Sequence, residues 1–276
     1  MSAPKHTIRD FTNPPVVETV LSVQFAPLSK VSIPHMGLYW QKIRHEFSRI
    51  ELRPPVAHVK EEFVSDPAKA AAQFNFELVP ATELQIRCWF LDKKGNKFLQ
   101  VQNDRFIHNW QKVTGDEIYP RYETVRSKFE EEWVRFCEFL KEENLGTPVV
   151  DQCEVTYVNH IEYGKGWKSY AELNKVIAPW SGTSSGEFLP APEKVNLNVT
   201  YLLPDNLGRL HISLLPVIRA RDAKEVLQLN LTARGAPASP ENKDIYEWLD
   251  LGRKWVVEGF TDFTNGEMHK TWGRTK

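Results

Sequence analysis

The sequence has 276 residues, of which 41% are hydrophobic and 26% are charged, and its formal net charge is −1. This length is sufficient for one large hydrophobic core or two small ones. A near-neutral charge disfavours a protein that coats nucleic acid, because neutralising many phosphates requires a clear basic excess. Nucleic-acid binding through a small local basic patch stays open.

The sequence also disfavours several other classes of protein. It begins without the hydrophobic region of a signal peptide, and no apolar run approaches the ~20 residues of a membrane span. Cys88, Cys137 and Cys153 are too widely spaced for a zinc site or a disulfide framework, so we expect buried, reduced thiols. Nucleotide-binding, metalloprotease and nucleophile-elbow motifs are absent. We therefore expect a cytoplasmic protein without membrane contact, metal or cofactor.

The first half of the chain contains β-branched runs typical of strands and apolar residues at helical spacing. The predicted elements are a strand over 16–25, a helix over 34–50, strands over 74–78, 84–91 and 97–110, and a long amphipathic helix over 120–143. Residues 51–72 are predicted to be irregular. A hairpin turn is expected at 92–96, where Gly95 can adopt a positive φ. A break is predicted near 144–150.

The second half repeats this order of elements. The predicted elements are a strand over 153–161, a short helix over 169–177, strands over 195–203, 209–218 and 226–233, and a helix over 241–260. We therefore predict an α+β protein made of two diverged β-α-β-β-β-α units, residues 1–146 and 147–276. They would form one continuous globule with an antiparallel sheet, helices on one face and a docked C-terminal tail. The saddle of the TATA-binding protein and the helix-grip fold are analogies for this architecture only.

Strand alternation in the second half separates an apolar face from a face rich in amides and hydroxyls. Three interpretations of the polar face stay open: a ligand or partner platform, a self-association surface, and an ordinary solvated sheet face. The candidate binding residues, taken from this face, the neighbouring strands and the tail, are Gln100, Gln102, Asp104, Arg105, His108, Glu154, Asn159, His160, Asn196, Asn198, Asn230, His269 and Arg274.

Two groups of these residues have side chains suited to chemistry. On the predicted strand 97–110, Asp104 and His108 would share a face about 13 Å apart, too far for a direct acid–base pair. Glu154 and His160 share the face of the following strand, with Asn159 opposite. General acid–base catalysis would require such groups within hydrogen-bonding reach of one substrate. The alternative for both groups is polar strand residues without a catalytic role.

Several segments together carry a resemblance to a known family. They are Asn13-Pro-Pro-Val-Val-Glu18, residues 100–112, Tyr119-Pro-Arg-Tyr-Glu123, Cys153–Ile161, Leu249-Asp-Leu-Gly-Arg253, Gly259–Thr264, Met268-His269 and Trp272-Gly-Arg274. With these motifs the chain resembles a sporadically distributed, uncharacterised bacterial protein family of about this length. The resemblance implies a free-standing bacterial protein and, from the patchy distribution, a role in antiviral defence or a toxin–antitoxin system.

These observations leave three hypotheses for function. The first is a non-catalytic binding or regulatory protein that recognises a ligand, a partner encoded nearby or a second copy of itself through the polar sheet face. The second is an enzyme, a nuclease or small-molecule hydrolase, that uses Asp104, Arg105, Glu154 and His160. The third is a nucleic-acid-binding module. The missing catalytic motifs and the amide-rich strands favour the first.

Overall fold

The computed structural model describes residues 8–63, 86–181 and 188–275. Its strands form one open, antiparallel, nine-stranded sheet in the order β2-β3-β4-β5-β1-β6-β9-β8-β7. The two central strands, β1 (Val16–Phe25) and β6 (Val150–Glu162), pair with each other. The α+β class and the antiparallel sheet predicted from the sequence are therefore confirmed.

The remaining strands extend outward from this central pair. On the side of β1 they are β5 (Arg105–Gln111), β4 (Lys97–Gln102), β3 (Arg87–Leu91) and β2 (Arg49–Arg53). On the side of β6 they are β9 (Lys224–Gly235), β8 (Arg209–Arg219) and β7 (Leu197–Leu202). Each half of the chain thus begins with a central strand and adds its last strand next to it.

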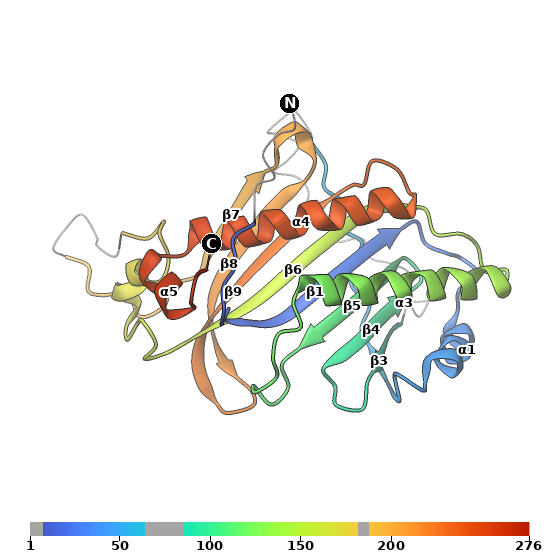
Figure 1. The fold of residues 1–276 in the computed structure, drawn as a ribbon, viewed down its shortest axis with the longest axis horizontal. Coiled ribbons are helices and arrows are strands. Elements are labelled where there is room, and N and C mark those ends of the chain that lie inside the picture. Colours follow the sequence, from blue (N-terminus) through green and yellow to red (C-terminus); the bar gives the residue numbers. More distant parts are fainter. Residues whose placement is uncertain (1–7, 64–85, 182–187, 276) are drawn as a thin grey trace.

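Two long helices, α3 (Tyr122–Glu142) and α4 (Asn242–Phe263), lie side by side across one face of the sheet (Figure 1). Both have the apolar stripe that the sequence predicts, and the stripe residues are buried against the sheet. In the part of the chain that the structure describes, the other helical elements are α1 (Ile33–Ile43), α5 (Gly266–Thr271) and the 3₁₀ turns Tyr170–Lys175 and Pro204–Asn206. None of the helices among the described residues combines the length and apolarity needed to cross a membrane.

The core between sheet and helices is dense in aromatic rings. Trp133 of α3 is 1% exposed, and its ring centroid lies 5.6 Å from that of Phe106 and 6.0 Å from that of Phe25. The Trp133 Nε1–H donates a 3.0 Å hydrogen bond to Asn242 Oδ1 at the first turn of α4. This bond joins the end of one long helix to the middle of the other.

Replacing Asn242 with alanine is expected to lower the free energy of unfolding by about 1 kcal/mol, because the buried Trp133 N–H loses its acceptor. Chemical denaturation of N242A measures this loss. The adjacent Lys243, whose side chain is 77% exposed, supplies the control, and K243A should change stability by less than about 0.5 kcal/mol. Equal effects of the two substitutions would contradict the role given to Asn242.

Several predicted boundaries are wrong. The single strand predicted over 97–110 is two strands, β4 and β5, joined by a turn at Asn103-Asp104. Asn and Asp favour turns because their side chains can hydrogen-bond to the local backbone. The helix predicted over 34–50 ends at Ile43, and edge strand β2 lies within the remainder and the region predicted to be irregular. The predicted strand 74–78 and the first two residues of the predicted strand 84–91 lie outside the described residues.

The C-terminal tail packs against α4 and the N-terminal segment. Trp272 is 6% exposed and lies 5.1 Å from the Phe260 ring. Phe11 forms an antiparallel bridge with Arg274, and Thr12 N donates to the Gly273 carbonyl at 2.9 Å. The tail therefore holds the N-terminal segment against the end of α4.

Candidate functional site

The face of the sheet opposite α3 and α4 carries the polar residues of the strand alternation. In the second half, the register places Thr156, Thr232 and His211 side by side, and likewise Val158, Asn230 and Ser213. In the first half, Arg87 donates to Gln100 at 2.9 Å, Gln100 to Asn109 at 2.8 Å, and Asn109 to Glu18 at 2.7 Å. The separation of apolar and polar faces predicted for the second half is thus present in the structure.

An extended segment of the chain itself, residues 54–63, crosses one end of this polar face. We call it the covering segment. Three glutamines from three strands bind its backbone, each donating to a carbonyl and accepting from an N–H. Gln102 binds Val56 in both directions at 2.9 and 3.0 Å, and Gln24 binds Val59 at 2.8 and 3.0 Å. Gln152 accepts from the Glu61 N–H at 2.8 Å and donates to the Val59 carbonyl.

The spacing of these glutamines fits an extended chain running across the strands. Gln102 on β4 and Gln24 on β1 are separated by two strand spacings, about 10 Å. Val56 and Val59 are three residues apart, which is also about 10 Å in an extended chain. The spacing of the glutamine side chains on the sheet thus matches the spacing of backbone groups along an extended polypeptide.

Glu61 anchors the C-terminal end of the covering segment. Its side chain is 7% exposed, and its carboxylate lies 2.5 Å from Arg209 Nη1, 2.6 Å from His211 Nε2 and 3.5 Å from Arg234 Nη1. Burial alone would raise the pKa of Glu61, but hydrogen bonds from His211 and Arg209 lower it to about 2. The carboxylate is therefore charged at neutral pH and joins the segment to β8 and β9.

Asp104 and Arg105 also hold the covering segment. Asp104, in the turn between β4 and β5, lies 3.1 Å from His58 Nδ1 and accepts a 2.6 Å hydrogen bond from Gln102. Arg105 donates to the Ala57 carbonyl at 2.9 Å and also to Gln24. The candidate residues Gln102, Asp104 and Arg105 therefore meet at one place, where they bind this chain's own backbone and His58.

Beyond the covering segment, the polar face continues over β6, β9, β8 and β7. We call this surface the distal patch; its residues are Thr156, His160, Asn198, Ser213, Gln228, Asn230 and Thr232. Most of these side chains are half-buried, and Asn198 is exposed. Asn230 donates to Ser213 Oγ at 3.2 Å, while Asn230 Oδ1 and His160 Nδ1 have no hydrogen-bond partner among the described residues. Asn196 precedes β7 and is exposed.

His108 does not share a face with Asp104, contrary to the prediction, because the turn at Asn103-Asp104 breaks the strand. It lies on the helix-covered face of β5, paired across strands with Leu21 and Leu99, and is 3% exposed. Burial, with smaller contributions from Lys97 and Lys128, lowers the pKa of His108 to about 3. His108 is therefore a neutral core residue.

Glu154 and His160 lie on one face of β6, as expected, but the strand is continuous between them. Six residues of strand span about 20 Å, so the two side chains cannot reach one small substrate. Glu154 pairs instead with Arg234 at 2.7 Å, and His160 lies 3.2 Å from Gln228 Oε1. The four residues of the enzyme hypothesis, Asp104, Arg105, Glu154 and His160, therefore do not form one site.

The remaining candidates, Asn159, His269 and Arg274, lie on the helix-covered side. Asn159 is 1% exposed, donates to the Leu229 carbonyl at 3.1 Å, and lines a cavity of about 210 Å³ beneath the N-terminal segment. His269 Nε2 lies 2.9 Å from Thr264 Oγ1, and its ring contacts Phe11. His269 and Arg274 thus support the segment that closes the cavity.

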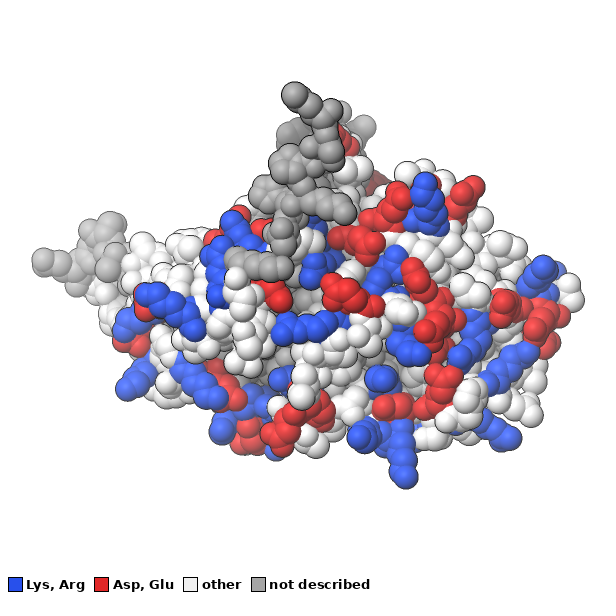
Figure 2. All heavy atoms as spheres, in the orientation of Figure 1, with Lys and Arg blue, Asp and Glu red and all other residues white. Residues whose placement is uncertain are grey.

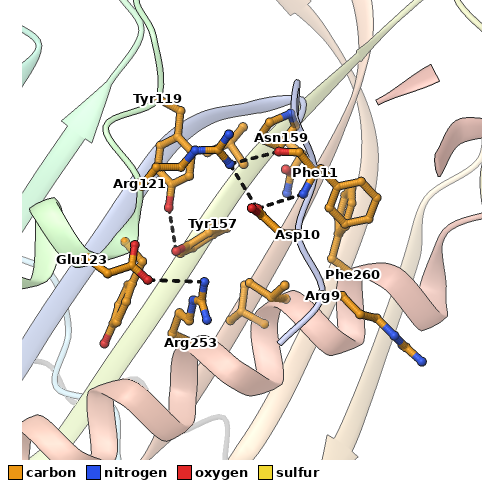
Figure 3. Close-up of a pocket in the computed structure, with 15 residues that line it drawn as sticks. Arg9, Asp10, Phe11, Tyr119, Arg121, Glu123, Tyr157, Asn159, Arg253 and Phe260 are labelled. Carbon is orange, nitrogen blue, oxygen red and sulfur yellow. Dashed lines mark hydrogen bonds and ion pairs between the residues drawn. The ribbon is translucent and has the colours of Figure 1, made fainter. Parts of the chain in front are cut away.

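Sequence reasoning did not select most residues of this cavity. Its lining includes Tyr119, Arg121, Tyr122 and Glu123, together with Tyr157, Arg253 and Phe260 (Figure 3). These belong to segments on which the sequence resemblance rests, Tyr119-Pro-Arg-Tyr-Glu123 among them. Among the lining residues, only Asn159 was a candidate from the sequence, and it was selected for its place on a strand. The signal that could have indicated the cavity is that several of the resemblance segments meet there.

The fold and these sites define a class: an α+β protein whose open sheet carries helices on one face and an extended segment of its own chain on the other. No family model, curated protein or solved structure matches the chain. Among residues 8–63, 86–181 and 188–275, no group of three His, Cys, Asp or Glu side chains is placed to bind a metal ion.

Proposed function

We propose that this chain is a non-catalytic binding protein that recognises an extended segment of a partner polypeptide on the distal patch. The observation that carries the proposal is the binding of the covering segment by Gln24, Gln102 and Gln152. These side chains bind backbone groups, which every polypeptide has. The covering segment is thus an intramolecular example of the recognition proposed for the partner.

The chemistry of the distal patch supports this proposal. Its amides and hydroxyls can both donate and accept, as a polypeptide backbone does, and they are mostly short and neutral. Thr156, Asn230 and Ser213 lie on the same strands that hold the end of the covering segment. A second extended chain can therefore cross the sheet beside the first without displacing it.

The charge distribution favours a protein partner over nucleic acid. On the helix-covered face, basic and acidic side chains of the described residues are interspersed (Figure 2). On the polar face, Arg209 and Arg234 are paired with Glu61 and Glu154. Phosphate binding would require these arginines to exchange carboxylates for phosphates.

The proposal extends to the architecture and the genetic context. The order of strands outward from β1 and from β6 supports two diverged copies of one unit, with β2 added in the first. The sequence resemblance supports a bacterial mobile or defence-type system, in which the partner would be encoded nearby. In this arrangement both copies hold the covering segment, through Gln24 and Gln102 of the first and Gln152 of the second, and the distal patch of the second copy binds the partner.

Site-specific photo-crosslinking in the native host tests the proposal. A benzophenone amino acid at position 213 on β8 should give one discrete adduct with a partner chain, because Ser213 faces the distal patch. The same group at position 254, exposed on α4, is the matched control and should not give that adduct. In the position-213 chain, N230A should reduce the adduct yield.

Two outcomes would contradict the proposal. A position-213 adduct with the mass of two copies of this chain would make the distal patch a self-association surface. Absence of any adduct specific to position 213, in a chain that folds normally, would remove partner recognition from this face.

A further inference from the structure

A second site, independent of the polar face, lies between α3, α4 and the N-terminal segment. The cavity of about 210 Å³ is bounded by the residues before and at the start of α3, by Tyr157 and Asn159 of β6, and by α4. Residues 9–14 pass over it (Figure 3). These residues are held by the tail, through Asn13 N to the Trp272 carbonyl at 3.0 Å, and by Arg121, which donates to the Phe11 carbonyl at 3.0 Å.

Arg253 supplies a cation to this cavity. It points from α4 toward Glu123 and Tyr157 (Figure 3), and its Nη2 lies 3.8 Å from Glu123 Oε1. Its Nε is buried without a hydrogen-bond partner among the described residues. Arg121, by contrast, is occupied by Asp10 at 3.2 Å and by the backbone of the N-terminal segment. Arg253 is thus the guanidinium with capacity for an anion.

The phenol groups beside Arg253 add hydrogen-bonding capacity. Tyr157 and Tyr119 hydroxyls lie 2.8 Å apart. Burial raises the pKa of Tyr157 to about 12, although the bonds to Tyr119 and Arg253 oppose the rise. Both hydroxyls therefore stay protonated at neutral pH and provide two protons for a mutual hydrogen bond and a ligand oxygen.

Part of the remaining wall is apolar, although Arg9, Asp10 and Asn159 also line the cavity. Phe11, Val16, Val256, Val257 and Phe260 line the cavity. A cavity of about 150 Å³ lined by apolar side chains accommodates benzene. The present volume therefore has room for a ring of that size and one small polar group.

We propose that this cavity binds a small monocarboxylate whose apolar body is the size of a benzene ring. The carboxylate lies at Arg253, which binds it through two parallel N–H donors, and the ring lies against Phe11, Val257 and Phe260. The N-terminal segment, held by the tail, closes over the ligand. The site faces away from the distal patch, so its test is independent of the polypeptide-binding proposal.

Calorimetric titration of the full chain with benzoate tests the inference. Benzoate should bind with one site per chain, and benzamide, the neutral isostere, at least about tenfold more weakly. R253Q should weaken benzoate binding by about tenfold or more, to the level of benzamide. R135Q is the matched control on α3, where the arginine pairs with Glu46 at 2.9 Å, and it should bind benzoate as the unmodified chain does.

A cavity-filling variant keeps the test decisive if R253Q does not fold. V257F places a ring in the volume proposed for the ligand and should abolish benzoate binding. Absence of benzoate binding at millimolar concentration would overturn the inference. So would equal binding of benzoate and benzamide, or unchanged binding in V257F.

Discussion

Between pH 7 and pH 4, protonation of His108 is expected to cost the unmodified chain about 3 kcal/mol of its free energy of unfolding. Replacing His108 with leucine should remove this loss. Burial lowers the pKa of His108 to about 3, from an ordinary value of 6.5. In this range the unfolded chain binds a proton that the folded chain excludes, so the stability contribution is complete above pH 6.5 and is lost as the pH falls toward 3. Each pH unit in that range costs about 1.4 kcal/mol.

Denaturant unfolding at several pH values measures this effect. H108L should retain neutral-pH stability to within about 1.5 kcal/mol, because leucine is similar in size and His108 Nδ1 has no partner to lose. H45L, a substitution of a histidine that is 65% exposed, is the control and should keep the pH dependence of the unmodified chain. If the stability of H108L fell with decreasing pH as steeply as that of the unmodified chain, His108 could not be a buried, neutral residue.

Replacing Glu61 with glutamine is expected to release the covering segment and cost about 3 kcal/mol at neutral pH. The substitution removes the charge that lies within 3.5 Å of Arg209, His211 and Arg234. The amides of Val56 and Val59, which donate to Gln102 and Gln24, should then exchange with solvent at least about tenfold faster. Hydrogen exchange read by mass spectrometry measures this change.

The same anchor predicts a pH dependence with a defined sign. Because the pKa of Glu61 is lowered to about 2 from an ordinary 4.5, its contribution is complete above pH 4.5 and is lost as the pH falls toward 2. E61Q should lack this component. K60A, at an exposed neighbouring position, is the control and should leave exchange of the covering segment unchanged. Normal protection in E61Q would contradict the anchor.

The features predicted from sequence are those set by local periodicity. The spacing of Tyr122, Val125 and Phe129 predicts α3, and the alternation over Leu227–Ala233 separates the two faces of β9. The turn at Asn103-Asp104 was not predicted, because the polar residues on both sides of it continue the alternation expected of a single strand. Strand β2 was not predicted, because it is an edge strand without buried residues. Its sequence therefore lacks the alternation of apolar and polar residues that identifies a strand.

The sites depend on contacts that local patterns cannot show. Gln24, Gln102 and Gln152 lie on separate strands, and only the sheet order brings them to one extended segment. The cavity joins residues as distant as Phe11 and Arg253. Local alternation identified Gln102 as polar, but could not indicate that its partner is the backbone of Val56.

Titration of the full chain with a fluorescein-labelled peptide of residues 54–63 tests most directly whether the polar face recognises extended polypeptide. In the unmodified chain the covering segment occupies the site and weakens apparent binding of the peptide. The E61Q chain, with that segment loosened, should bind the peptide, whose own Glu61 is intact, at least about tenfold more tightly. Adding Q24A and Q152A should abolish the gain. Failure of E61Q to bind the peptide, or unchanged binding after the glutamines are removed, would contradict recognition by this face.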